Sequence, residues 1–259
     1  MKAIRADLPE ELDNIFIYPL ADFHLGDLSS DWFLVKKLLA KIEETPNAYC
    51  ILGGDLMDTA IASSIGDTYA ANLNPMSQIE TCCKIFEPIK DKVLGIVGGN
   101  HERRVYKQDG IDMTQIFANQ LGLTDKYSET TFVLFVRFGH DTRKGRRGRK
   151  QEYTIYCTHG SGGGRKEGGK INRLVDLQDI IDADVYITAH THLPASLKTS
   201  FFRADRNNSC VKEVTHTFVN TASALRYGGY GEVQGYKPAS NDYPVIELIG
   251  KKHKAIVHI

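Results

Sequence analysis

Acidic, histidine and asparagine side chains recur in this sequence directly after runs of apolar residues. Five runs are followed in this way, by the segments DFH, GGDLMD, GGNHE, THG and AHTH. These segments contain Asp22, His24, Asp55, Asn100, His101, Glu102, His159, His190 and His192. Carboxylates together with neutral imidazoles form sites for borderline divalent metals such as manganese, iron and zinc. No cysteine stands within these segments, so we do not expect a structural tetrahedral zinc site.

Each motif alone also has an ordinary structural explanation. A single histidine near the end of a strand is more often a hydrogen-bonded structural residue than a ligand. Gly53-Gly54-Asp55 is compatible with a turn in which glycine takes a positive φ and aspartate caps the next element. Gly98-Gly99-Asn100 has the same explanation. The combination argues for a functional site, because five successive strand ends with ligand-type side chains are hard to obtain by coincidence.

The elements that must position these side chains follow from the hydrophobic pattern. Apolar runs predict buried strands over 14–20, 48–52, 92–97, 153–157 and 184–188, and later strands over 215–220, 245–249 and 254–259. Apolar residues at helical spacing predict helices over 29–44, 77–90, 112–121 and 172–181. Strand–helix units followed by strands alone indicate an α/β fold of layered sheets flanked by helices. Since ligands bind at the carboxyl ends of strands in such folds, the motif side chains should meet there.

Composition excludes several other classes of protein. The 259 residues are 42% hydrophobic and 25% charged, which is ordinary globular usage and excludes wholesale disorder. The longest apolar runs are far shorter than the roughly 18 residues of a membrane span. The five cysteines form no CxxC pair and the polar N-terminus lacks a signal-peptide core, so we expect a reduced, cytoplasmic protein. No composition break divides the chain, and we expect a single domain over 1–259, of undetermined oligomeric state.

Positive charge is concentrated in one segment, although the chain as a whole has no net charge. Six of the eight residues between 143 and 150 are lysine or arginine. They fall between the strand over 153–157 and another expected over 131–138, so a solvated hairpin tip is one explanation. The other explanation is contact with a polyanionic substrate, because several phosphates can then be neutralised at once. A second, looser basic group, at Arg165, Lys166, Lys170 and Arg173, follows the THG motif.

The ordered motifs resemble those of the calcineurin-like metallophosphoesterases. That family carries D-x-H, G-D-x-x-D/R, G-N-H-D/E, a later histidine and G-H-x-H, which match this chain from Asp22 to His192. Two positions depart from the pattern: Ala189 replaces the usual glycine, and GGDLMD lacks the Arg-Gly ending of the protein serine/threonine phosphatases. The ligand-type residues are intact, so metal binding is still expected, whereas a phosphoprotein substrate is not.

The resemblance implies a two-sheet β-sandwich flanked by helices and a centre of two divalent metal ions. It implies that Asp22, His24 and His192 bind the first ion, that Asn100, His159 and His190 bind the second, and that Asp55 bridges them. Manganese is the expected metal, with iron, zinc, nickel or magnesium as alternatives. His101 would act as general acid or as a donor to the leaving oxygen, and Glu102 would orient its imidazole.

The resemblance further implies a phosphoesterase in which a metal-bridging hydroxide attacks the phosphorus atom. Because basic residues flank the expected crevice, we expect a phosphodiesterase or nuclease that acts on nucleic acid or nucleotides. Arg143, Arg146, Arg147, Arg165 and Lys166 are the expected substrate contacts. A phosphomonoesterase or nucleotide pyrophosphatase is the alternative. A non-catalytic scaffold of the same fold is less favoured, because such relatives usually lack ligands or the histidine after the asparagine.

Overall fold

The strands of the computed structural model form two sheets of six strands each, within the described residues 1–61, 71–142, 148–228, 232 and 235–259. The first sheet has the order β1 (Lys2–Asp7), β6 (Thr131–Phe138), β7 (Gln151–Thr158), β8 (Val185–Thr188), β10 (Cys210–Asn220) and β9 (Ala195–Asp205). The second has the order β12 (Ala255–His258), β11 (Val245–Ile249), β2 (Asn14–Leu20), β3 (Ala48–Leu52), β4 (Val93–Val97) and β5 (Tyr127–Ser128).

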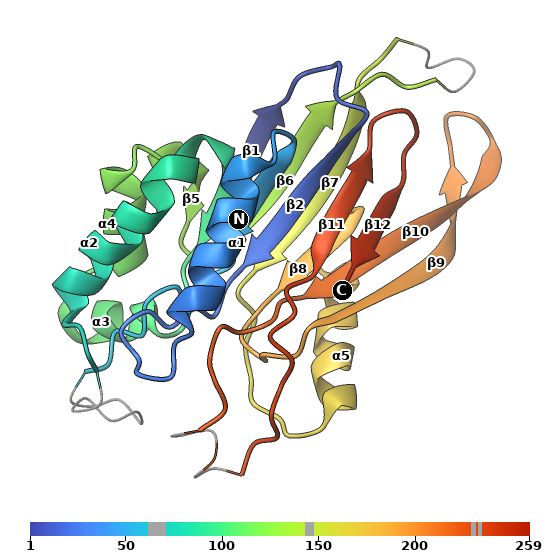
Figure 1. The fold of residues 1–259 in the computed structure, drawn as a ribbon. Coiled ribbons are helices and arrows are strands. Elements are labelled where there is room, and N and C mark those ends of the chain that lie inside the picture. Colours follow the sequence, from blue (N-terminus) through green and yellow to red (C-terminus); the bar gives the residue numbers. More distant parts are fainter. Residues whose placement is uncertain (62–70, 143–147, 229–231, 233–234) are drawn as a thin grey trace.

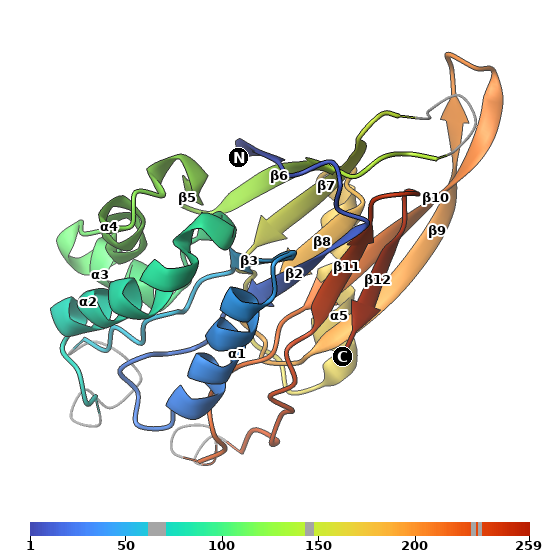
Figure 2. The ribbon, with the colours of Figure 1, turned by 45° about the horizontal axis from the view of Figure 1, so that its top comes forward.

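The helices cover the outer faces of the two sheets (Figure 1). They are α1 (Trp32–Glu44), α2 (Pro75–Phe86), α3 (Glu102–Asp109), α4 (Met113–Gln120) and α5 (Glu167–Val175), with short 3-10 turns over Glu87–Lys92, Thr124–Lys126 and Asp176–Asp179. The helices α1 to α4 lie on the side of the second sheet, and α5 packs on the first sheet against β8 and β10 (Figures 1 and 2). The predicted sandwich of two sheets flanked by helices is confirmed.

Three hydrophobic clusters hold these layers together. One lies between the second sheet and its helices, one between the two sheets, and a smaller one beneath α5. Central strands contribute to two clusters at once: in β4, Ile96 faces the helices and Val97 faces the other sheet. Such a strand is buried on both faces, which is why β2, β3 and β4 read as continuous apolar runs.

Parallel pairing gathers the ends of the central strands. β2, β3 and β4 are parallel to one another in the second sheet, as are β7, β8 and β10 in the first. The loops after β2 and β8 meet, because the backbone N–H of His190 donates to Asp22 Oδ2 over 3.0 Å. The loops after β3 and β7 also meet, since Nδ1 of His159 lies 2.7 Å from the carbonyl oxygen of Gly53. The two sheets therefore present their strand ends to one common site.

Several elements differ from their sequence predictions. Helix α5 begins at Glu167 and ends at Val175, whereas we expected 172–181. Helix α2 begins at Pro75 with Asn74 as its cap, ahead of the expected start at 77, and gives way to a 3-10 turn after Phe86. No prediction included β1, α3 or β9, which bury few of their residues. Within the described residues, no helix is both long enough and apolar enough to cross a membrane.

Candidate metal centre

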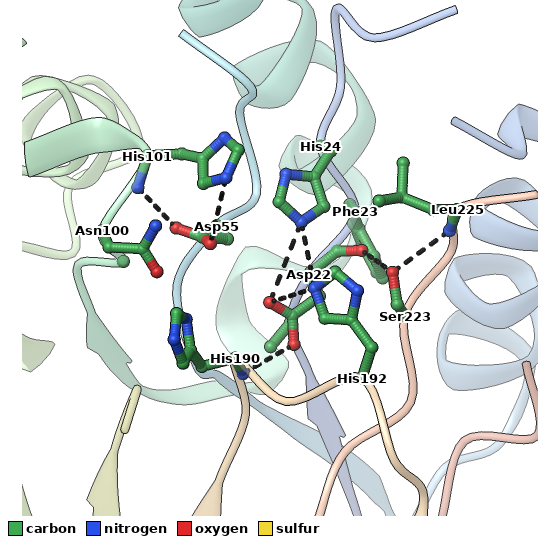
Figure 3. Close-up of polar contacts among 12 residues, drawn as sticks. Asp22, Phe23, His24, Asp55, Asn100, His101, His190, His192, Ser223 and Leu225 are labelled. Carbon is green, nitrogen blue, oxygen red and sulfur yellow. Dashed lines mark hydrogen bonds and ion pairs between the residues drawn. The ribbon is translucent and has the colours of Figure 1, made fainter. Parts of the chain in front are cut away.

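The motif side chains lie on the loops that follow five strands and converge in space (Figure 3). Asp22 and His24 follow β2, Asp55 follows β3, and Asn100 and His101 follow β4. His159 follows β7, and His190 and His192 follow β8. The structure thus brings together all seven side chains that we expect, from the sequence, to bind metal. Asp22, His24 and Asp55 are almost fully buried, while the His101 and His192 side chains are 18% and 32% exposed, so solvent enters beside the two histidines.

Unusual backbone conformations mark this convergence. Asp22, His24, Asp55, His190 and His192 all have φ between 47° and 66°, in the left-handed region. Only two other non-glycine residues of the described chain, Thr59 and Ser209, share that region. The left-handed conformation costs a non-glycine residue about 1–2 kcal/mol. Five such residues in one place indicate that these backbone conformations serve to position the side chains and do not stabilise the loops locally.

Asp22, His24 and His192 form a first cluster of metal-ligand type. His192 Nε2 lies 3.4 Å from both Asp22 Oδ1 and His24 Nε2, and His24 Nε2 lies 3.9 Å from Asp22 Oδ1. Ligands at 2.0–2.2 Å from one ion lie about 3–3.5 Å from each other, so two of these three spacings suit a shared ion. Asp22 Oδ1 is also buried and has no hydrogen-bond partner among the described residues. A buried carboxylate oxygen without a partner is costly, and a bound cation would satisfy it.

Asp55, His159 and His190 form a second cluster. His159 Nε2 lies 3.3 Å from Asp55 Oδ2 and 3.0 Å from Asn100 Oδ1. The opposite ring nitrogen of His159 donates to the Gly53 carbonyl oxygen. Such a second hydrogen bond fixes the tautomer of a ligand histidine and directs its free nitrogen toward the ion. Asn100 therefore joins this cluster through its side-chain oxygen.

Opposite charges stabilise each other within the second cluster. Burial opposes ionisation of Asp55, yet His159, His101 and His24 hold the pKa of this carboxyl well below its usual value. Burial likewise opposes a charge on His159. The attraction of Asp55, to which Asp22 adds, is stronger than this effect and raises the pKa of His159 to about 10. Both effects show that the carboxylates attract positive charge into a buried space. Their environment suits divalent cations.

His101 stands beside the second cluster and forms a third group of metal-ligand type with His24 and Asp58, and Asp58 orients it. His101 Nδ1 lies 2.9 Å from Asp58 Oδ1 and 3.0 Å from the Asp58 carbonyl oxygen, so it donates to Asp58. His101 Nε2 lies 3.8 Å from Asp55 Oδ2. Burial and Arg104 disfavour a charged ring, but Asp58 and Asp55 outweigh them and raise the pKa of His101.

The expectation that Glu102 orients the imidazole of His101 is wrong. Both carboxylate oxygens of Glu102 accept hydrogen bonds from backbone N–H groups, those of Asp55, Met57 and Gly99, each over 3.0 Å. Glu102 is the first residue of α3 and is buried. Glu102 therefore ties the loop after β3 to the loop after β4, and Asp58 takes the orienting role that we predicted for Glu102.

Glu102→Gln should therefore lower stability. A glutamine keeps one acceptor oxygen but turns an NH₂ group toward backbone N–H donors, which leaves buried polar groups unpaired. We expect the free energy of unfolding to fall by about 1–3 kcal/mol. Urea unfolding at pH 8 measures this, since burial and Asp55 raise the pKa of Glu102 to about 7 and the carboxyl is ionised at pH 8. As a control, Glu129→Gln removes an exposed partner of Arg103 and should change stability by less than about 0.5 kcal/mol. Equal effects of the two variants would contradict the tying role.

The predicted substrate contacts are placed only in part. Arg143, Arg146 and Arg147 lie outside the described residues, in the connection between the antiparallel strands β6 and β7. Arg165 and Lys166 are exposed, on the segment that follows His159. The guanidinium of Arg165 lies 6.0 Å from the ring centre of Tyr236.

Three contacts near the centre were not predicted from the sequence. Arg104 Nη2 lies 2.9 Å from His101 Nε2. Lys170 donates to the carbonyl oxygen of Thr191, between His190 and His192, over 2.8 Å. The segment after β10 holds the loop of Asp22, because the Ser223 hydroxyl donates to the Asp22 carbonyl oxygen over 3.0 Å. The contact of Ser223 could have been predicted, since polar residues follow β10 as they follow the other strands.

Comparison with known proteins identifies a family for this chain. The family model described as calcineurin-like phosphoesterase matches residues 20–194. No match is found among curated proteins. A solved structure of a conserved uncharacterised protein, a predicted phosphoesterase from Streptococcus pneumoniae TIGR4, is similar with 12% identity, 95% of this chain and 99% of that chain covered, and a TM-score of 0.38. A single mutant of Vps29 from Entamoeba histolytica is similar with 14% identity, 95% and 100% covered, and a TM-score of 0.40. The family model spans all nine motif residues, from Asp22 to His192, and the chain belongs to the calcineurin-like phosphoesterase family.

Proposed function

We propose that this protein is a metal-dependent phosphodiesterase that hydrolyses nucleic acid or nucleotide phosphodiesters. The observation that supports it best is the pair of carboxylate–imidazole clusters on one strand-end surface, with His101 beside them. Membership of the calcineurin-like phosphoesterase family makes phosphoester hydrolysis the expected chemistry. A scaffold of this fold would not need a complete set of ligand-type residues together with His101.

Two divalent ions fit the residues present, and they would activate a water molecule and neutralise charge on the phosphoryl oxygens. Asp22, His24 and His192 would hold one ion, and Asn100, His159 and His190 the other, with Asp55 shared between them. The unpartnered Asp22 Oδ1 and the carbonyl-anchored ring of His159 support this division. Manganese suits a mixed set of carboxylate, amide and imidazole ligands, and is the metal that we propose.

His101 supplies the proton that the leaving oxygen needs. Asp58 holds Nδ1, so Nε2 is the nitrogen that faces the centre and the one that can pass a proton to the substrate. A donor held in this way contributes through its position as well as its acidity. Glu102 acts on the site indirectly, by keeping the loops of Asp55 and Asn100 at a fixed separation.

The charge around the opening favours a polyanionic substrate. Arg104 and Lys170 lie on the side of His101 and of the loop between His190 and His192, and Arg165 and Lys166 are exposed after β7. Several cations around a partly exposed centre can neutralise several phosphates of one chain. We therefore infer that nucleic acid or a nucleotide, and not a small monoester, is the natural substrate.

The test is hydrolysis by protein stripped with a chelator and then reloaded with Mn²⁺. We expect stripped protein to be inactive and reloaded protein, carrying about two ions per chain, to cleave bis(4-nitrophenyl) phosphate faster than 4-nitrophenyl phosphate. Single-stranded and double-stranded DNA and RNA, cyclic nucleotides and mononucleotides complete the substrate panel. Faster cleavage of monoesters than of diesters throughout would overturn the phosphodiesterase assignment, and two bound ions without any hydrolysis would favour a scaffold.

A further inference from the structure

Arg104 is a cation without a carboxylate partner at the edge of the candidate metal centre. It lies in the first turn of α3, three residues after His101, and is partly buried. Its neighbour Arg103 forms an ion pair with Glu129 over 3.2 Å. Arg104 forms no ion pair within the part of the chain that the structure describes; its side-chain contact is the one from Nη2 to His101 Nε2, over 2.9 Å.

This contact occupies the atom of His101 that the proposed chemistry needs. A guanidinium has only N–H donors, so Nε2 must be the acceptor, and Nδ1 carries the ring proton that it donates to Asp58. An imidazole nitrogen has one lone pair in the ring plane, and Arg104 uses it. A proton on Nε2 and the guanidinium cannot share this position, so the guanidinium must move away before His101 can serve a leaving oxygen.

The positive charge of Arg104 determines the position to which its guanidinium would move. Close to two divalent ions, an unpaired guanidinium is repelled unless an anion lies between them. The group that brings an anion to that place is the phosphoryl group of the substrate. The planar fork of a guanidinium matches two oxygens of a phosphate, which makes arginine the common residue for this contact.

We propose that Arg104 is a substrate-binding residue whose guanidinium leaves His101 Nε2 and donates to non-bridging oxygens of the phosphoryl group under attack. The proposal rests on the proposed function and adds a phosphate ligand to it. In the free protein Arg104 fills the space beside His101, and on binding it exchanges one acceptor for another. Binding of the phosphoryl group and release of His101 thereby become one event.

The experiment compares Arg104→Gln and Arg104→Lys with Arg103→Gln, a control of the same type one residue away on the same helix. Calorimetry measures the affinity of the Mn²⁺-loaded proteins for inorganic phosphate, and kcat and KM are measured with bis(4-nitrophenyl) phosphate. Charge-assisted hydrogen bonds contribute roughly ten- to a hundredfold to an equilibrium constant, so Arg104→Gln should lose that much phosphate affinity. Arg104→Lys should retain part of it, and Arg103→Gln should stay within about twofold of the parent.

The outcomes separate this inference from the proposed function. Phosphate affinity of Arg104→Gln equal to that of Arg103→Gln overturns the inference, even if the parent is an active phosphodiesterase. A lower kcat with unchanged phosphate affinity also overturns it, because Arg104 then only positions His101. Loss of bound metal from Arg104→Gln overturns it as well. If the parent binds phosphate through Arg104 but hydrolyses nothing, the inference stands and the proposed function fails. Partial recovery of Arg104→Gln by added guanidinium ion would support the inference further.

Discussion

Asp55→Asn is expected to abolish hydrolysis and to reduce bound metal while the fold persists. The Asp55 side chain is 1% exposed and ionised, and its two oxygens contact groups on the loops that follow β4 and β7. Oδ1 accepts from the backbone N–H of His101 over 2.8 Å, and Oδ2 lies 3.3 Å from His159 Nε2. Asparagine would halve the acceptor capacity of this position and would remove the negative charge that two cations need.

We expect the turnover of Asp55→Asn to fall by more than about 10³-fold, because the charge stabilisation that metal ions provide is worth several kcal/mol. Metal analysis should find fewer than two ions per chain, and circular dichroism should remain that of the parent, since the strands on either side are unaffected. Asp109→Asn is the matched control, because Asp109 is exposed at the end of α3 and touches neither cluster. An Asp55→Asn protein that keeps two ions and turns over at a near-normal rate would refute the role of Asp55.

The sequence predicted the strands that carry an apolar run and missed β1 and β9, which bury few of their residues. β2, β3 and β11 have the residue limits that their apolar runs predict. β1 was not predicted because it is an edge strand of its sheet and only Ile4 is buried. β9 is exposed along most of its length, so no alternation marks it. The periodicity of apolar residues reflects burial of side chains. A strand that buries few side chains and pairs mainly through its backbone therefore shows little of this periodicity.

Glycine and helix signals explain the remaining errors. Gly168 and Gly169 lie in the first turn of α5, where local propensity argues against a helix. Packing on β8 and β10 outweighs that cost, and the helix starts five residues before the predicted position. Helix α3 buries only Glu102 and Val105, so its short polar sequence shows no apolar stripe. In each case tertiary contacts decide what local sequence leaves open.

The candidate site was predictable in its membership but not in its connections. The rule that strand ends meet was sufficient to bring together side chains from five loops. The roles of Asp58 and Glu102 were not predictable, because each depends on the direction of a side chain within a loop. Three adjacent residues, His101, Glu102 and Arg103, point to three different partners: Asp58, the backbone of neighbouring loops, and Glu129. Left-handed backbone at five motif residues is likewise invisible in the sequence, since none of them is glycine.

His101→Ala should separate metal binding from chemistry. His101 Nδ1 is held by Asp58, and Nε2 lies 3.8 Å from Asp55 Oδ2 without belonging to either of the two proposed ligand sets. Its loss should leave two ions bound while kcat falls by about 10²–10⁴-fold, the usual contribution of a positioned proton donor. Asp58→Asn should cause a smaller loss, of about 10–100-fold, because the ring remains but its orientation is less well fixed.

The leaving group provides the decisive comparison for His101. A leaving oxygen of low pKa needs little protonation, so the loss in His101→Ala should shrink as aryl phosphodiesters are varied from poor to good leaving groups. Rates across such a series, with metal content measured for each protein, test this directly. A pure metal ligand at position 101 would instead reduce the rates of all substrates equally and lower the number of bound ions. The combination of constant metal content and a leaving-group-dependent loss is expected only if the Nε2 atom of His101 meets the departing oxygen.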